Sequence, residues 1–324
     1  MKLFKNYWMT AVIALLWFLP AAAWAKTPVN VQVSILPQKY CVERIGKDRV
    51  NVDVLVKPGK SPEVYSPSPD QIKKLVAADI YFRIGIDFET GLMDKIQSTA
   101  GLKIVDTREG IILRDMEAHS HEGEDHVAGH AEGEDHDHDA EDHGHEADHD
   151  ADHHEDQKHP AHTGKDPHIW MSPDNVKIQA HTIFQALVQM DPEGRESYQA
   201  NYDAFVKDLD ALDLRLKEVF KPLQGENLFV FHPAFGYLTD RYGLRQIAVE
   251  TMGKAPKGKD LSNIIKLAKK EKTRVIFVQP QFDRTAAEKI ASAINGVVMA
   301  IDPLAYDYPA NMETMAKTIA GALK

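Results

Sequence analysis

The chain has 324 residues, and setting aside an apolar N-terminal segment and one strongly biased segment leaves about 250 residues, enough for two compact domains. The formal net charge is -11, but residues 118–162 hold 16 acidic side chains against one lysine, so the remainder is nearly neutral. The composition therefore excludes the basic footprint of a nucleic-acid-binding protein, and the single cysteine, Cys41, excludes a disulfide framework and a multi-cysteine zinc site.

The first 25 residues have the pattern of a signal peptide. Two lysines precede an apolar run from Trp8 to Leu19, and Ala23-Trp24-Ala25 fits a signal-peptidase site. The run is short for a membrane span, and no cysteine stands at the cleavage point to support a lipoprotein anchor. We expect residues 1–25 to be removed, and the mature protein to lie in a Gram-negative periplasm without membrane insertion.

Both halves of the mature chain alternate strand-like and helix-like segments. The candidate strands of the first half are the apolar or β-branched runs at 29–36, 50–56, 80–84 and 103–105. Helical spacing covers 38–47, 69–77 and 89–98, and the first of these helices carries Cys41, which we expect to be buried and unreactive. The second half offers strands at 228–231, 246–249, 274–278 and 297–301. The pattern predicts an α/β protein with two parallel sheets, each flanked by helices.

A long amphipathic helix separates the two halves. Residues 195–220 contain no glycine or proline, and their apolar side chains recur every three or four positions. A helix of this length spans roughly 40 Å, which is long enough to run from one lobe to another. We therefore expect an N-terminal lobe at 26–194, an interlobe helix at 195–220 and a C-terminal lobe at 221–324.

The segment at 118–162 is a low-complexity insert in the first lobe, and it holds most of the 16 histidines of the chain. It has too few apolar residues to bury a core, so we expect a disordered loop. Its imidazoles predict weak zinc binding. Its role is left open between metal capture or sensing, a metal buffer and a solvated acidic linker. These histidines are His119, His121, His126, His130, His136, His138, His143, His145, His149, His153, His154, His159 and His162.

Outside the insert, candidate metal ligands follow predicted strands. His232 comes directly after the run Leu228-Phe229-Val230-Phe231, and Asp302 follows the strand at 297–301. The carboxyl ends of parallel strands are where open α/β sheets bind ligands. A turn or helix cap is the alternative for Asp302. His181 lies in a predicted helix at 174–190 and is expected to be an ordinary surface or packing histidine.

The first lobe offers two more candidates on loops. Glu63 lies in the turn-rich segment Lys57-Pro58-Gly59-Lys60-Ser61-Pro62-Glu63, after the strand at 50–56. His168 lies in Asp166-Pro167-His168-Ile169-Trp170, just before a predicted helix start. A cation held by Glu63, His168, His232 and Asp302 would bridge the lobes.

With these motifs in place, the chain resembles the zinc and manganese branch of ABC-transporter solute-binding proteins, whose two lobes are joined by one long rigid helix. The resemblance extends from the first strand to Asp302-Pro303-Leu304. Its other specific motifs are Asp166-Pro167-His168-Ile169-Trp170-Met171-Ser172-Pro173 and Phe231-His232-Pro233-Ala234-Phe235-Gly236-Tyr237. The acidic, histidine-rich insert is similar to that of the zinc-uptake members. This resemblance implies that His168, His232 and Asp302 are metal ligands.

The resemblance also implies a monomeric receptor that delivers Zn²⁺ to a membrane permease, with Mn²⁺ as the less favoured cargo. Many members have a histidine where this chain has Glu63, and a carboxylate can take that place because it also ligates zinc. The added oxygen moves the site toward manganese. A metallohydrolase is disfavoured, since the chain has no His-Glu-x-x-His segment and four protein ligands leave no position for a catalytic water.

Overall fold

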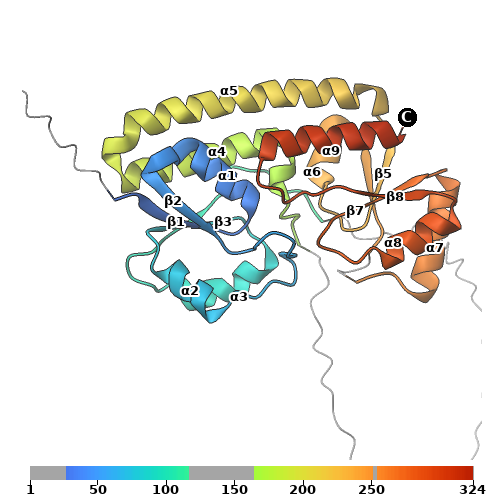
Figure 1. Cartoon of the computed structure of the whole chain (residues 1–324), viewed down its shortest axis with the longest axis horizontal. Coiled ribbons are helices and arrows are strands. Elements are labelled where there is room, and N and C mark those ends of the chain that lie inside the picture. The colour runs from blue at the N-terminus through green and yellow to red at the C-terminus, as the bar shows by residue number, and fades with distance from the viewer. Residues whose placement is uncertain (1–26, 117–163, 251–253, 324) are drawn as a thin grey trace, which may run out of the picture.

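The computed structural model describes residues 27–116, 164–250 and 254–323. The predicted signal peptide and the predicted histidine-rich insert lie outside these ranges. The described residues form two four-stranded parallel sheets with helices on both faces of each (Figure 1). No helix in these ranges is both long enough and apolar enough to cross a membrane.

The first sheet has the strand order β2-β1-β3-β4. Its strands are β1 (Val29–Val33), β2 (Val50–Val54), β3 (Ile80–Arg83) and β4 (Lys103–Asp106). The helices around it are α1 (Leu36–Gly46), α2 (Pro69–Val76), α3 (Asp87–Ile96) and α4 (Pro173–Met190). Successive side chains of β3 point to opposite faces of the sheet. Tyr81 therefore packs in the core beneath α2 and α3, and Phe82 packs in the core beneath α1 and α4. Both faces of the sheet are therefore buried.

The second sheet repeats this arrangement in the order β6-β5-β7-β8. Its strands are β5 (Asn227–Val230), β6 (Arg245–Ala248), β7 (Val275–Val278) and β8 (Val297–Ala300). The helices around it are α6 (Gly236–Tyr242), α7 (Gly258–Lys270), α8 (Thr285–Ala293) and α9 (Tyr308–Leu323). Phe229 packs with residues of α7 and α8, whereas Val230 faces the core shared with α9.

Helix α5 (Arg195–Phe220) runs along both lobes (Figure 1). It packs on α1 and α4 of the first lobe and on α6 and α9 of the second. Its buried side chains, Phe205 and Leu209 among them, belong to one apolar core that extends across both lobes. The helix has the predicted bounds 195–220, and it joins the lobes as a continuous packed element.

The other predicted elements are found with small shifts at their ends. The first strand was expected to reach residue 36, but it ends at Val33, and α1 begins at Leu36. Pro37 explains the difference, because its fixed φ suits the first turn of a helix. Cys41 is buried on α1, as expected, and burial raises the pKa of its thiol to about 12. Short 3₁₀ turns at Lys47–Arg49, Ile169–Met171, Pro192–Gly194 and Lys221–Leu223 complete the connections.

Candidate metal centre

His168 lies on the loop that precedes α4, and its ring is held by one aspartate. Oδ1 of Asp166 accepts hydrogen bonds from the backbone N–H of His168, at 2.9 Å, and pairs with its Nδ1, at 2.7 Å. Both residues are buried. With Nδ1 engaged in this way, Nε2 is the ring nitrogen left to face the pocket.

His232 follows β5, where the sequence pattern placed it. Its backbone is fixed by Gln279, which accepts from the His232 N–H at 3.2 Å and donates to the His232 carbonyl at 2.6 Å. Nδ1 of His232 lies 2.7 Å from Oε1 of Glu250, and the ring stacks on Phe282 with centroids 5.0 Å apart. His232 is therefore oriented on three sides, and its Nε2 also faces the pocket.

Glu63 reaches the same pocket from the loop between β2 and α2. The Ser61 hydroxyl donates to its carboxylate, and Tyr65, two residues further on, hydrogen-bonds the Leu55 carbonyl at the end of β2. Ser68 then caps α2 in a reciprocal pair with Gln71. The turn-rich sequence thus forms a pinned loop, and the Glu63 side chain is only 16% exposed.

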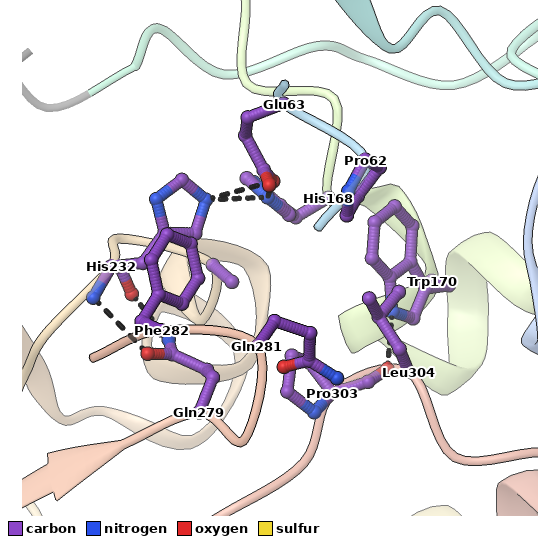
Figure 2. A pocket seen from close by; sticks show the side chains of 11 residues that line it. Pro62, Glu63, His168, Trp170, His232, Gln279, Gln281, Phe282, Pro303 and Leu304 are labelled. Atoms are coloured by element: carbon purple, nitrogen blue, oxygen red, sulfur yellow. Dashed lines mark hydrogen bonds and ion pairs between the residues drawn. The ribbon is translucent and has the colours of Figure 1, made fainter. Parts of the chain in front are cut away.

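The three side chains converge on one point (Figure 2). Nε2 of His232 lies 3.2 Å from Nε2 of His168 and 3.1 Å from Oε1 of Glu63, and Oε1 is 3.5 Å from Nε2 of His168. Zinc with bonds of 2.0–2.2 Å in a tetrahedron separates its ligand atoms by about 3.3 Å. The three atoms therefore have the spacing of three vertices of such a tetrahedron. Within the three described ranges, no other group of three or more His, Cys, Asp or Glu side chains has this property.

Asp302, the fourth residue predicted for the site, is not part of this group. It follows β8, and its Oδ1 accepts from the backbone N–H of Leu304 and from Nε2 of Gln281, both at 2.9 Å. It lines a cavity of about 270 Å³ next to the pocket, and its neighbours Pro303 and Leu304 line the pocket itself. His181 is exposed and contacts the rings of Phe184 and Tyr202, as expected of a surface or packing residue.

The site is electrostatically coupled. Burial disfavours the charged form of each side chain, but the neighbouring histidines hold the pKa of Glu63 well below its ordinary value. The pKa of His232 rises to about 10, since the Glu63 and Glu250 carboxylates outweigh the effect of burial. Asp166 likewise raises the pKa of His168 despite its burial. The arrangement favours positive charge between the carboxylates, which a divalent cation supplies.

Two residues of the candidate site are not predicted from the sequence: Asp166 and Glu250, the carboxylates that contact the Nδ1 atoms of the two histidines. Such carboxylate–histidine pairs fix the tautomer and orientation of metal-binding imidazoles. Asp166 is itself held by Arg114, whose Nη1 lies 3.1 Å from its Oδ2 and whose Nε donates to Asp240 of the second lobe. Asp166 could have been suspected from its place two residues before His168. Glu250 follows the strand β6, and only the fold brings it to His232.

Loops of both lobes meet around the pocket. Glu63 and His168 come from the first lobe and His232 from the second. Trp170 of the first lobe donates from Nε1 to the carbonyl of Pro303 in the second, at 2.8 Å. The model of the family described as ZnuA, the periplasmic component A of the zinc-uptake complex, matches residues 31–322. The chain belongs to this family.

Named ZnuA proteins are similar to the chain over most of their length. The high-affinity zinc uptake system protein ZnuA of Yersinia pestis is 26% identical over 308 residues, which cover 93% of this chain and 91% of that protein. A crystal structure of ZnuA matches with a TM-score of 0.75 and 32% identity, and covers 92% of this chain and 100% of that chain. A ZnuA deletion mutant with zinc bound gives the same TM-score and identity, covering 92% and 98%.

ZnuA membership confirms the resemblance identified from the sequence motifs. It also confirms the predicted fold, since the solved ZnuA structures match nearly the whole chain. The family is one of substrate-binding components of zinc-uptake complexes and not a class of enzymes.

Proposed function

We propose that the protein is the zinc-binding receptor of a bacterial zinc-uptake system and that it carries Zn²⁺ as cargo between Glu63, His168, His232 and Asp302. The observation that carries the proposal is the spacing of Glu63 Oε1 and the two imidazole Nε2 atoms, 3.1–3.5 Å from one another. Neutral imidazoles and carboxylates are ordinary zinc ligands. The family match supports zinc as the cargo.

Asp302 supplies the fourth ligand in this proposal. The proposal requires the loop after β8 to bring the Asp302 carboxylate to the pocket, which the following residues Pro303 and Leu304 already line. The complete set has two nitrogens and two carboxylates, so its two negative charges neutralise the cation. Two oxygen donors also make Mn²⁺ the competing cargo, and zinc is favoured because manganese prefers sites dominated by oxygen.

The transport role follows from the family and from the way both lobes contribute ligands. The receptor takes up zinc in the periplasm after export with a cleaved signal peptide, and it works as a monomer. It delivers the ion to the membrane permease of an ABC transporter. It is not a catalyst, because four protein ligands leave a zinc ion without an open position for a reacting water.

The histidine-rich insert adds a second class of weaker zinc sites. The interlobe ligands are preorganised by buried hydrogen bonds, whereas the composition of the insert, rich in histidines and carboxylates and poor in apolar residues, predicts no such preorganisation. The two classes therefore differ in affinity. The interlobe site carries the receptor function, and the insert serves metal capture.

The test is a zinc titration of the intact chain and of a variant lacking residues 118–162, each in competition with a chelator of known affinity and then with manganese. We expect one tight zinc in both proteins and additional weak zinc only in the intact chain. A variant that loses its tight zinc with the insert would support the metal-buffer alternative and overturn the proposal. A tight site that prefers manganese would make manganese the cargo and leave the proposed receptor function in place.

A further inference from the structure

Gln281 stands at the boundary between the pocket and the cavity beside it. It lines the pocket together with Glu63, His168 and His232, and it lines the neighbouring cavity together with Asp302. Figure 2 shows its side chain across the pocket from Glu63. Gln281 lies in none of the motifs identified in the sequence. Its side chain hydrogen-bonds Asp302 and so connects that carboxylate to the wall of the pocket.

The orientation of the Gln281 amide is set by Asp302. Its Nε2 donates to Asp302 Oδ1 at 2.9 Å, whereas its Oε1 is buried and has no hydrogen-bond partner within the described part of the chain. The flipped amide would place a carbonyl oxygen against a carboxylate, where neither group can donate. A buried acceptor without a donor, such as Gln281 Oε1, costs free energy. Because the side chain keeps this orientation despite that cost, the bond to Asp302 is the interaction that fixes it.

The same bond limits what Asp302 can offer a cation. Oδ1 of Asp302 accepts from both Gln281 and the backbone N–H of Leu304, at 2.9 Å each. Of the described residues, none forms a hydrogen bond with Oδ2. A carboxylate whose one oxygen holds two donors ligates a metal through the other oxygen. Ligating carboxylates are generally hydrogen-bonded in this manner.

We propose that Gln281 is a specificity-determining residue of the metal site: it keeps Asp302 to a single-oxygen contact and thereby favours zinc over manganese. The inference rests on the proposed function, because it takes Asp302 as the fourth ligand. Two imidazoles and two single carboxylate oxygens complete the four-coordinate shell of zinc. Manganese takes more oxygen ligands, and a carboxylate that chelates with both oxygens would supply one of them.

The test compares Gln281→Leu with the parent chain. Leucine has a similar volume but no donor, so Asp302 Oδ1 keeps only the hydrogen bond from the Leu304 N–H, and one of its two lone pairs becomes available to the cation. We expect the ratio of zinc to manganese affinity, measured by competition, to fall by about tenfold, the lower range for loss of a hydrogen bond to a ligating residue. With Co²⁺ as a probe, the visible absorption should weaken as the ion passes from four-coordinate to five-coordinate.

Two further variants make the result specific. Gln199→Leu removes an amide that also donates to an aspartate, Asp203, but on the exposed surface of α5, and it should leave both readouts unchanged. In an Asp302→Asn background, Gln281→Leu should shift neither the affinity ratio nor the Co²⁺ spectrum further. That result would show that Gln281 acts through Asp302.

Three outcomes would overturn the inference. Equal loss of zinc and manganese affinity in Gln281→Leu would mean that the residue only supports the fold. A shift that persists in the Asp302→Asn background would mean that it acts by another route. If Asp302→Asn alone leaves zinc affinity and the Co²⁺ spectrum unchanged, Asp302 is not a ligand, and the inference falls while the site of Glu63, His168 and His232 stands. Failure of the proposed function itself would appear separately, as zinc binding that survives His232→Ala.

Discussion

Nε2 of His168 and Nε2 of His232 lie 3.2 Å apart, although the two residues are 64 positions apart in the chain and belong to different lobes. Each ring is turned toward the other by a carboxylate on its far side, Asp166 for His168 and Glu250 for His232. Two imidazoles rarely face each other in this way without a shared proton or cation, since two protonated nitrogens would repel. The pair is therefore the centre of the proposed zinc site.

Replacing either histidine should remove tight zinc binding. His168→Ala and His232→Ala each leave one nitrogen in the site, so zinc affinity should fall far more than tenfold, or more than about 1.4 kcal/mol, in a chelator competition assay. His181→Ala is the matched control, because that ring is exposed and only contacts Phe184 and Tyr202. Equal effects at all three positions would place the site elsewhere.

The carboxylates behind the histidines should matter without contacting the ion. Asp166→Asn and Glu250→Gln keep the shape of each side chain but remove the charge that orients the imidazole, and zinc affinity should fall by about 10-fold to 100-fold. Glu288→Gln, on the exposed surface of α8, should have no effect. Thermal unfolding of each variant, with and without zinc, distinguishes a loss of zinc affinity from a loss of fold stability. An unchanged zinc affinity in both variants would show that neither carboxylate positions its ring.

Glu63 tests the donor composition of the site. Glu63→Ala removes a donor and a charge from the group, so zinc affinity should fall strongly. Glu63→His restores a donor and raises the number of nitrogens, which should retain zinc binding but lower the relative affinity for manganese. Both variants are measured in the same zinc and manganese competition. If both variants bind zinc and manganese as the parent chain does, Glu63 is not a ligand.

The coupled site predicts that zinc binding releases protons. The pKa of His232 is raised to about 10, so its ring is protonated at neutral pH and the entering cation must displace that proton. Zinc affinity should thus rise with pH between 6 and 8, by about tenfold per unit if one proton is released. Calorimetry in buffers of different ionisation enthalpy counts the protons. If zinc binding released no proton, the raised pKa of His232 would be contradicted.

The sequence predicts elements well where a local pattern is unbroken. Helix α5 begins and ends where its apolar spacing does, and His232 and Asp302 follow their strands as expected. The pattern is less precise where a proline starts a helix within an apolar run. The predicted first strand therefore extends to residue 36, beyond its end at Val33.

Contacts between distant residues were harder to predict. Glu250 pairs with His232 only because β6 lies beside β5 in the sheet, and no spacing along the chain indicates that neighbour. Gln281 follows β7, and its bond to Asp302 depends on β7 lying beside β8. The candidate ligands lie in recognisable motifs, whereas the order of the strands in the sheet decides which residues orient them.

X-ray absorption at the zinc edge tests the central claim most directly. The intact chain loaded with one equivalent of zinc should show two imidazole nitrogens and two oxygens at about 2.0–2.2 Å, with no sulfur. His232→Ala at the same loading should lose this first shell and show instead the imidazole-rich or water-rich shell of weaker sites. A parent spectrum with only oxygen neighbours, or one unchanged by His232→Ala, would contradict an interlobe zinc site.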